Sequence, residues 1–256
     1  LMNREHKWEV GVSSGSYYPS LTQEFSGRDI GLAYEDDHMG LQFFAYSYHI
    51  DELDDPKDVS KRLYSLELLL NGALRVSWAG TRECATNFTY FSEINVGGNH
   101  GIWADSIEEY PFSRNPQIDQ FRPAHDDPRT YFPSYLLYLS RQSNELRSLL
   151  FLCGLISKNS PLETILTWST LYKIMDCVRH YSNLAGISMN DIVSPTELNK
   201  FTAACNNMSI LGLNARHGAA GNPPPTRVMT SIDEAIDLIL GMASSFSRRF
   251  LAIKYL

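Results

Sequence analysis

Three polar residues near the C-terminal end of the chain offer the clearest chemistry in the sequence. Asn214, Arg216 and His217 place an amide, a permanent cation and a titratable imidazole within one short segment. Such a trio can bind a phosphate and move a proton near neutral pH. RNA carries its own nucleophile in the 2′-hydroxyl group, so an Arg and a His can support strand cleavage without a metal ion. These side chains are therefore candidate catalytic residues.

The same residues also have a structural explanation, because they come where the third of four expected helices ends. Basic side chains are favoured at helix C-termini, where they offset the negative end of the helix dipole. Gly218, which follows them, is an ordinary residue just after a helix. A capping role and a functional role both stay open.

Asp176 is the fourth polar candidate. It interrupts an apolar stretch, residues 174–178, of the second expected helix. A carboxylate at this position can orient His217 or Arg216 from across a helical bundle. Basic residues near it in the sequence make a solvated helix face the alternative.

Other catalytic patterns are absent from the sequence. It contains no Walker motif, no HExxH, no GxSxG and no dinucleotide-binding fingerprint. The other histidines lack metal-ligand spacing, and the four cysteines form no CxxC pair. We therefore expect no metal and no cofactor, and reduced thiols that behave as small apolar side chains.

Four amphipathic helices are expected in the C-terminal half, where they position the polar candidates. The first covers residues 134–155. The second and the third each open on Ser-Pro-x-Glu, at residues 160–163 and 194–197, which is typical of a capping box with Pro in the first turn. The fourth carries an apolar seam over residues 232–253. So long a seam must be buried, either in its own bundle or against another subunit.

The N-terminal half predicts a mixed α/β domain. Two β-rich runs, residues 31–34 and 41–50, flank a short acidic gap, which is typical of a hairpin. The second run is aromatic on both faces, so we expect it to be an interior strand. A helix is expected over residues 58–70, and Asn71 with Gly72 is expected to stop it. Further expected elements are strands at residues 74–78 and 88–96 and a tight turn at residues 97–101.

A domain boundary is predicted in the proline-rich stretch of residues 110–133, where helical and strand periodicity is lost. The prediction gives a mixed domain of residues 1–125 and a helical domain of residues 126–256. Residues 1–130 hold 21 acidic and 11 basic residues, a net charge of −10, and residues 131–256 hold 8 and 11, a net charge of +3. The acidic half argues against nucleic-acid contact there, whereas the other half permits contact with RNA.

The C-terminal half resembles the HEPN superfamily, whose members are domains of four to five helices with a polar motif near the third-to-fourth helix junction. The resemblance covers roughly residues 134–256, and it rests on residues 171–176, 214–218 and 229–235. It implies an RNA-directed protein, often a homodimer. Many members are metal-independent ribonucleases of toxin, CRISPR-linked and antiviral systems, and others are inactive binding modules. The family separates its Arg and His by four to six residues, whereas Arg216 and His217 are adjacent.

The expected fold is therefore α+β, with a β-rich mixed domain followed by a HEPN-like bundle of about four helices. One expected function is RNA binding or metal-independent RNA cleavage in bacterial defence or a toxin system, centred on Arg216, His217, Asn214 and Asp176. The alternative is a non-enzymatic sensor or adaptor that dimerises through its helical domain, with an unknown ligand on the first domain. No membrane-spanning run and no signal-peptide core is found, so a cytoplasmic location is expected.

Overall fold

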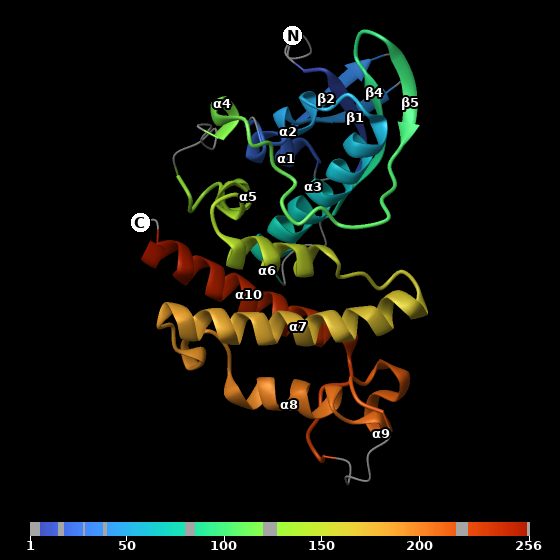
Figure 1. Cartoon of the computed structure of the whole chain (residues 1–256). Helices are drawn as coiled ribbons and strands as arrows, with labels where there is room; N and C mark the ends of the chain where they lie inside the picture. Colours follow the sequence, from blue (N-terminus) through green and yellow to red (C-terminus); the bar gives the residue numbers. More distant parts are fainter. Residues whose placement is uncertain are drawn as a thin grey trace. The chain divides into compact units, whose positions relative to one another are not determined.

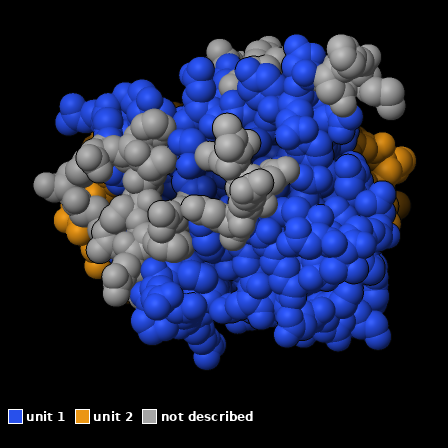
Figure 2. Space-filling model, turned by 90° about the horizontal axis from the view of Figure 1, so that it is seen from above, with its two compact units in different colours: residues 1–74, 84–147 blue, residues 75–83, 148–256 orange. Residues whose placement is uncertain are grey.

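The computed structural model describes seven stretches of the chain, which are residues 6–14, 18–27, 29–37, 40–79, 85–119, 127–218 and 225–254. The fold is α+β, as the sequence predicted, with an antiparallel sheet in the N-terminal part and a mostly helical C-terminal part (Figure 1). Two compact units are present (Figure 2). Unit 1 comprises residues 1–74 and 84–147, and unit 2 comprises residues 75–83 and 148–256. The predicted boundary between residues 125 and 126 lies outside the described residues, and residues 127–147 belong to unit 1.

The described part of unit 1 forms a five-stranded sheet with the strand order β2-β3-β1-β4-β5, in which all neighbours are antiparallel. The strands are β1 (Trp8–Ser14), β2 (Gly31–Asp37), β3 (Gly40–Tyr46), β4 (Thr86–Glu93) and β5 (Gly97–Gly101). The predicted hairpin of β2 and β3 is confirmed, and so is the interior position of β3. β3 ends at Tyr46, however, because Ser47 caps a short helix, α2 (Tyr48–Asp51).

The core of unit 1 begins on β1. Its alternate residues Trp8, Val10 and Val12 are buried, as expected of a strand with one face against a core. Gly11 lies opposite Tyr90 of β4. A Cβ atom on Gly11 would lie 2.3 Å from the Tyr90 ring, so only glycine lets this ring cross the strand.

Helix α3 (Pro56–Ser77) is longer than the sequence indicated. The expected stop at Asn71 and Gly72 is wrong, and so is the strand expected at residues 74–78. The Asn71 side chain exchanges hydrogen bonds with the backbone of Thr86, of 2.9 and 2.8 Å. Because a residue 15 positions away satisfies the Asn71 amide, Asn71 does not need to leave the helix, and the apolar side chains beyond it stay buried.

The tight turn expected at residues 97–101 is also wrong. The turn occupies residues 94–96, and residues 97–101 form β5. Gly97 and Gly98 have φ values of 76° and 91°, which favour glycine and accompany a shift in the β4–β5 register. His100 of β5 stacks its ring on Phe91, with 5.1 Å between the centroids.

The first helix expected in the C-terminal half is two helices, α5 (Phe132–Ser140) and α6 (Asn144–Gly154). The break follows from side chains that a periodicity pattern does not show. The Ser143 hydroxyl accepts the N–H of Leu146 and so opens α6, while Arg141 sends its guanidinium into the core of unit 1. The remaining described helices of unit 1 are α1 (Tyr18–Glu24) and α4 (Pro116–Asp119).

Unit 2 is built around α7 (Pro161–Ala185) and α10 (Ile232–Lys254), which pack side by side (Figure 1). The predicted start of α7 is confirmed, because Ser160 caps it by accepting the N–H of Glu163. The seam of α10 is buried within unit 2 at Ile239, Ala243, Phe246 and Phe250, whereas Ile253 at its end is 59 % exposed. Packing within unit 2 itself thus accounts for the burial of most of the seam.

Helix α8 (Pro195–Cys205) ends earlier than expected. Its first residues form no capping box, since Ser194 makes no side-chain cap and Glu197 binds Lys200 instead, at 2.7 Å. The next elements are a short helix, α9 (Met208–Leu211), and a 3-10 turn, η2 (Gly212–Asn214); a second 3-10 turn, η1 (Met189–Asp191), precedes α8. Within the described residues, no helix combines the length and apolarity needed to cross a membrane.

Candidate functional site

Arg216 is held by two elements of unit 2. Its backbone N–H donates to the carbonyl oxygen of Cys205, the last residue of α8, at 2.7 Å. Its guanidinium carbon lies 4.1 Å from the centre of the Tyr172 ring on α7. A cation over an aromatic face is attracted by the ring quadrupole, and arginine stacks flat on such rings. The Arg216 side chain is exposed, so its guanidinium is accessible to solvent while Tyr172 holds it in position.

The sequence predicted that Asn214, Arg216 and His217 end a long helix, and this prediction is wrong. α8 ends at Cys205, and Asn214 lies in the 3-10 turn η2, which Arg216 and His217 follow. The early end has a local cause, because the Asn207 side chain accepts the N–H of Ser209 and so starts the separate helix α9. It is the backbone of Arg216, and not its charge, that satisfies a terminal carbonyl of α8.

Among the described residues, the other candidates form no closed site with this stack. Asn214 donates from its amide nitrogen to the carbonyl oxygen of Leu211 at 3.2 Å, which is a bond within its own turn. His217 is exposed, and among the described residues its side chain makes no hydrogen bond or ion pair. Asp176 is exposed and lies 3.8 Å from Arg179.

Asp176 nevertheless shares a helix face with the stacked ring. It follows Tyr172 by four residues on α7, so the two side chains point the same way, about 6 Å apart along the axis. The name Arg216 surface is used here for Arg216 and Tyr172, which are in contact, together with the candidates that share their elements or directly neighbour them in the chain: Asp176, Asn214 and His217. The exposed groups of this surface are the guanidinium of Arg216, the imidazole of His217 and the carboxylate of Asp176.

Cys205 lies beneath this surface and is not a nucleophile. Burial raises the pKa of its thiol to about 12, although the nearby Arg216 acts in the opposite direction. The thiolate, and not the thiol, is the reactive form. Cys205 therefore remains a packed thiol, as the sequence predicted for the cysteines of the helical half.

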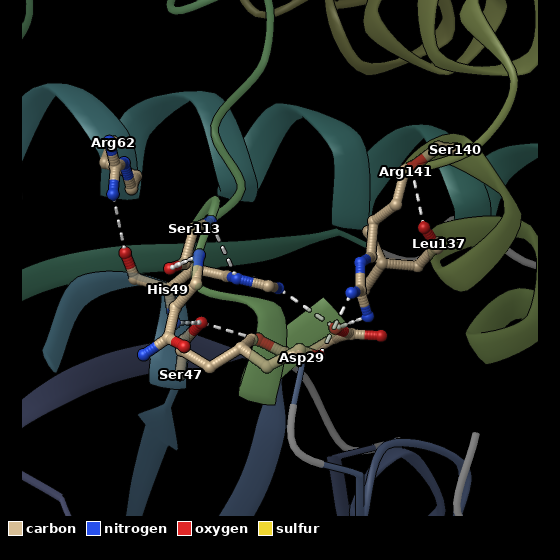
Figure 3. Close-up of polar contacts among 10 residues, drawn as sticks. Asp29, Ser47, His49, Arg62, Ser113, Leu137, Ser140 and Arg141 are labelled. Carbon is tan, nitrogen blue, oxygen red and sulfur yellow. Dashed lines mark hydrogen bonds and ion pairs between the residues drawn. The ribbon is translucent and has the colours of Figure 1, made fainter. Parts of the chain in front are cut away.

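The most tightly connected polar cluster lies in unit 1, and the sequence did not reveal it (Figure 3). One carboxylate oxygen of Asp29 lies 2.9 Å from the His49 ring and 2.8 Å from the Arg141 guanidinium. The other ring nitrogen of His49 lies 3.0 Å from the backbone nitrogen of Ser113. A backbone N–H can only donate, so this ring nitrogen accepts, and the nitrogen facing Asp29 carries the proton.

Further bonds link this cluster to the chain around it. Arg141 also donates to the carbonyl oxygen of Ile118 at 3.1 Å. Arg62 donates to the carbonyl oxygen of His49 at 2.9 Å and makes a bidentate pair with Glu108. Burial lowers the pKa of Arg62, but Glu108 and Glu52 more than offset this and raise it.

The Asp29–His49–Arg141 cluster is closed to substrates. His49 is 0 % exposed, Arg141 5 % and Asp29 8 %. Each charged group has a partner of opposite charge or a hydrogen bond, which is the condition under which a protein tolerates buried charge. The cluster therefore stabilises unit 1 by joining α2, α5 and the segment around Ser113. Its members are separated by up to 112 positions, so no local motif identifies them.

Unit 2 also contains an open groove of about 480 Å³ beside the first turns of α8 and α10. Lys200 and Arg227 contribute its positive charges, Glu197 and Glu234 its negative ones, and Met229 is part of its apolar lining. Lys200 lies on α8, the helix whose last carbonyl holds Arg216. The groove therefore brings two further cations to the neighbourhood of that helix.

Metal ligands do not gather in any described part of the chain, since no group there combines three or more His, Cys, Asp or Glu side chains. Comparisons with protein-family models, with curated proteins and with solved structures found no match for this chain. The resemblance to the HEPN superfamily stays a prediction that rests on the residues of the sequence.

Proposed function

We propose that unit 2 binds single-stranded RNA through the Arg216 surface without cleaving it. The observation that supports this most is the Arg216 guanidinium 4.1 Å above the Tyr172 ring. The ring orients the guanidinium, whose N–H groups remain available for a phosphate. Unstacked RNA bases commonly pack on aromatic rings and on guanidinium planes, so the same pair suits a single strand.

The charge of unit 2 supports the same proposal. Unit 2 holds 11 basic and 8 acidic residues, a net charge of +3. Lys200 precedes Cys205 by five residues on α8, which is about 7.5 Å along the helix axis. The proposed path of the strand runs from Arg216 along α8 toward Lys200 and Arg227, at the other end of this helix. The proposal places this binding in the cytoplasm, the location expected from the sequence.

Binding has more support than cleavage. Strand cleavage needs a base held within reach of the 2′-hydroxyl and oriented by a partner. The carboxylate expected to orient His217 is instead paired with Arg179, at 3.8 Å. A role in bacterial defence or in a toxin system rests on the family resemblance alone.

The test uses the full chain and a fluorescein-labelled RNA of 20 mixed-sequence nucleotides, without metal. Anisotropy measures binding, and a gel of the same samples measures cleavage. Arg216→Ala should weaken binding about tenfold, or about 1.4 kcal/mol, and Arg216→Lys should restore only part of this. Arg249→Ala is the matched control, because Arg249 is an exposed arginine elsewhere in unit 2 that donates to the Asp191 carbonyl oxygen.

Two outcomes would contradict the proposal. Equal losses in Arg216→Ala and Arg249→Ala would mean that unit 2 attracts RNA only by diffuse charge. Metal-free cleavage that disappears in His217→Ala would mean that the protein is a ribonuclease with His217 in its active site.

A second candidate function, a dimeric adaptor, is favoured by exposed leucines on α7. Leu162 is 65 % exposed and Leu166 is 56 % exposed, and they lie one turn apart on the same face. Neighbouring exposed apolar side chains mark contact surfaces. Light scattering tests this function: a dimer that Leu162→Glu with Leu166→Glu dissociates supports it, and a 29.0 kDa monomer at tens of micromolar contradicts it.

A further inference from the structure

The two edge strands of the sheet in unit 1 differ in regularity. β5 has glycines of positive φ at Gly97 and Gly98 and a shifted register against β4. Irregularity of this kind hinders pairing with another strand. β2, at the other edge, keeps an unbroken register with β3 from Gly31 to Asp37. Its backbone is therefore straight enough to accept a further strand.

Among the residues that the structure describes, the one hydrogen bond to the outer edge of β2 beyond the short bridge at Gly31 is at its start. The N–H of Leu32 donates to the carbonyl oxygen of Phe25 at 2.8 Å, so Leu32 directs its backbone groups away from β3. These directions alternate along a strand of an antiparallel ladder, so the backbone groups of Tyr34 and Asp36 also point outward. No described residue forms a hydrogen bond with the outward groups of these two residues. They offer two donors and two acceptors.

The side chains beside this open edge are partly apolar. Tyr34 is 47 % exposed and Leu41 is 52 % exposed. Tyr34 pairs with Phe43, and Asp36 pairs with Leu41, so Tyr34 and Leu41 lie on the same face of the hairpin. Leu32 on that face is buried, which means that the apolar face continues past the end of the core.

The charge of the edge decides which partner fits. Glu35 and Asp36 are exposed there, and unit 1 holds 21 acidic and 11 basic residues, a net charge of −10. A second copy of β2 would bring carboxylates against carboxylates, which is unfavourable. A strand that carries lysine or arginine meets opposite charge instead.

We propose that the outer edge of β2 binds an extended, basic segment of another protein by strand addition. Main-chain bonds to Tyr34 and Asp36 hold the segment. Its basic side chains pair with Glu35 on one face of the strand, and its apolar ones contact Tyr34 and Leu41 on the other face, which Asp36 shares. Such strand addition is a recurring mode of peptide recognition. The site is independent of RNA binding, because all of its residues belong to unit 1.

The first experiment measures binding of a labelled peptide with the sequence Lys-Val-Lys-Val-Lys-Val, blocked at both ends, to the full chain. Glu35→Lys combined with Asp36→Lys should weaken binding at least tenfold. Glu109→Lys, an exposed acidic residue elsewhere in unit 1, is the matched control and should change it less than twofold. A Glu-Val peptide should not bind. Absence of Lys-Val binding up to millimolar concentration would overturn the proposal, as would equal effects of the two charge reversals.

The second experiment tests the main-chain bonds. Peptides methylated at alternate backbone nitrogens come in two sets, and only the set that blocks the pairing edge should lose binding. Amide hydrogen exchange at Tyr34 and Asp36 should slow when the unmethylated peptide binds, because their N–H groups become bonded. Equal binding of both sets, or unchanged exchange, would show attraction by charge alone. Sedimentation that detects a dimer broken by Tyr34→Pro would assign the edge to a second copy.

Discussion

The two units of this protein treat polar side chains in opposite ways. In unit 1, Asp29, His49 and Arg141 meet at hydrogen-bond distance, and all three are buried. In unit 2, Arg216 and His217 lie on the surface, and the third candidate, Asp176 of α7, is exposed as well. By residue type both sets could serve catalysis. Exposure separates them, because a site must admit its ligand, whereas a fully satisfied buried cluster specifies a fold.

The largest expected effect sharpens this contrast. Arg141→Ala leaves Asp29 and His49 buried without the cation, so unfolding by denaturant should show a loss of about 3–5 kcal/mol. Arg114→Ala, an exposed arginine of unit 1, should change stability by no more than about 0.5 kcal/mol. A loss below about 1 kcal/mol for Arg141→Ala would mean that the cluster does not stabilise unit 1.

A carboxyl group of α3 gives unit 1 a pH dependence. Burial raises the pKa of Glu67 to about 7, although a backbone hydrogen bond from Phe88 acts in the opposite direction. The folded state therefore binds more protons than the unfolded state between about pH 4.5 and 7, and stability falls as pH rises through this window. Glu67→Gln should remove the free-energy cost of holding an ionised carboxylate at this position. It should therefore stabilise the protein by on the order of 1–3 kcal/mol at pH 8.

The same substitution should change little at pH 4, where Glu67 is protonated in both states. Glu109→Gln, at an exposed site, is the control for the loss of one negative charge. A gain at pH 8 that is equal in the two variants would assign the effect to net charge rather than to the half-buried Glu67 carboxyl.

Arg216 should behave as the opposite of Arg141. Its contact with Tyr172 is at the surface, where a cation–π pair contributes about 0.5–1 kcal/mol. Arg216→Ala should therefore cost no more than this in thermal or denaturant unfolding, while it weakens RNA binding about tenfold. A loss of stability as large as that of Arg141→Ala would make Arg216 a structural residue and break the comparison.

The smallest expected effect concerns the groove of unit 2. Lys200 is paired with Glu197, so its contact with a phosphate is partly offset. Lys200→Ala should weaken RNA binding only a few-fold. It should reduce the slope of log affinity against log salt by about 0.7, the contribution of one phosphate contact to a single strand. An unchanged slope would mean that RNA does not reach Lys200.

Local patterns determined much of the fold in advance. Two β-rich runs around a short acidic gap predicted the β2–β3 hairpin, and a Ser-Pro-x-Glu start predicted α7. The long seam predicted α10 and its burial. These features depend on residues within a few positions of one another, so sequence alone suffices for them.

Tertiary partners decided the rest. The sequence predicts that Asn71 stops a helix. In the structure, α3 continues past Asn71 because the backbone of Thr86 satisfies its side-chain amide. The sequence predicts Arg141 within one long helix. In the structure, that helix is interrupted at Arg141, whose guanidinium bonds Asp29, 112 positions away in the chain. The residue types of the Arg216 surface were evident in the sequence, whereas the ring that orients Arg216 belongs to another helix. The bonds of a side chain depend on which residues lie beside it in the folded protein, and separation along the sequence does not give separation in space.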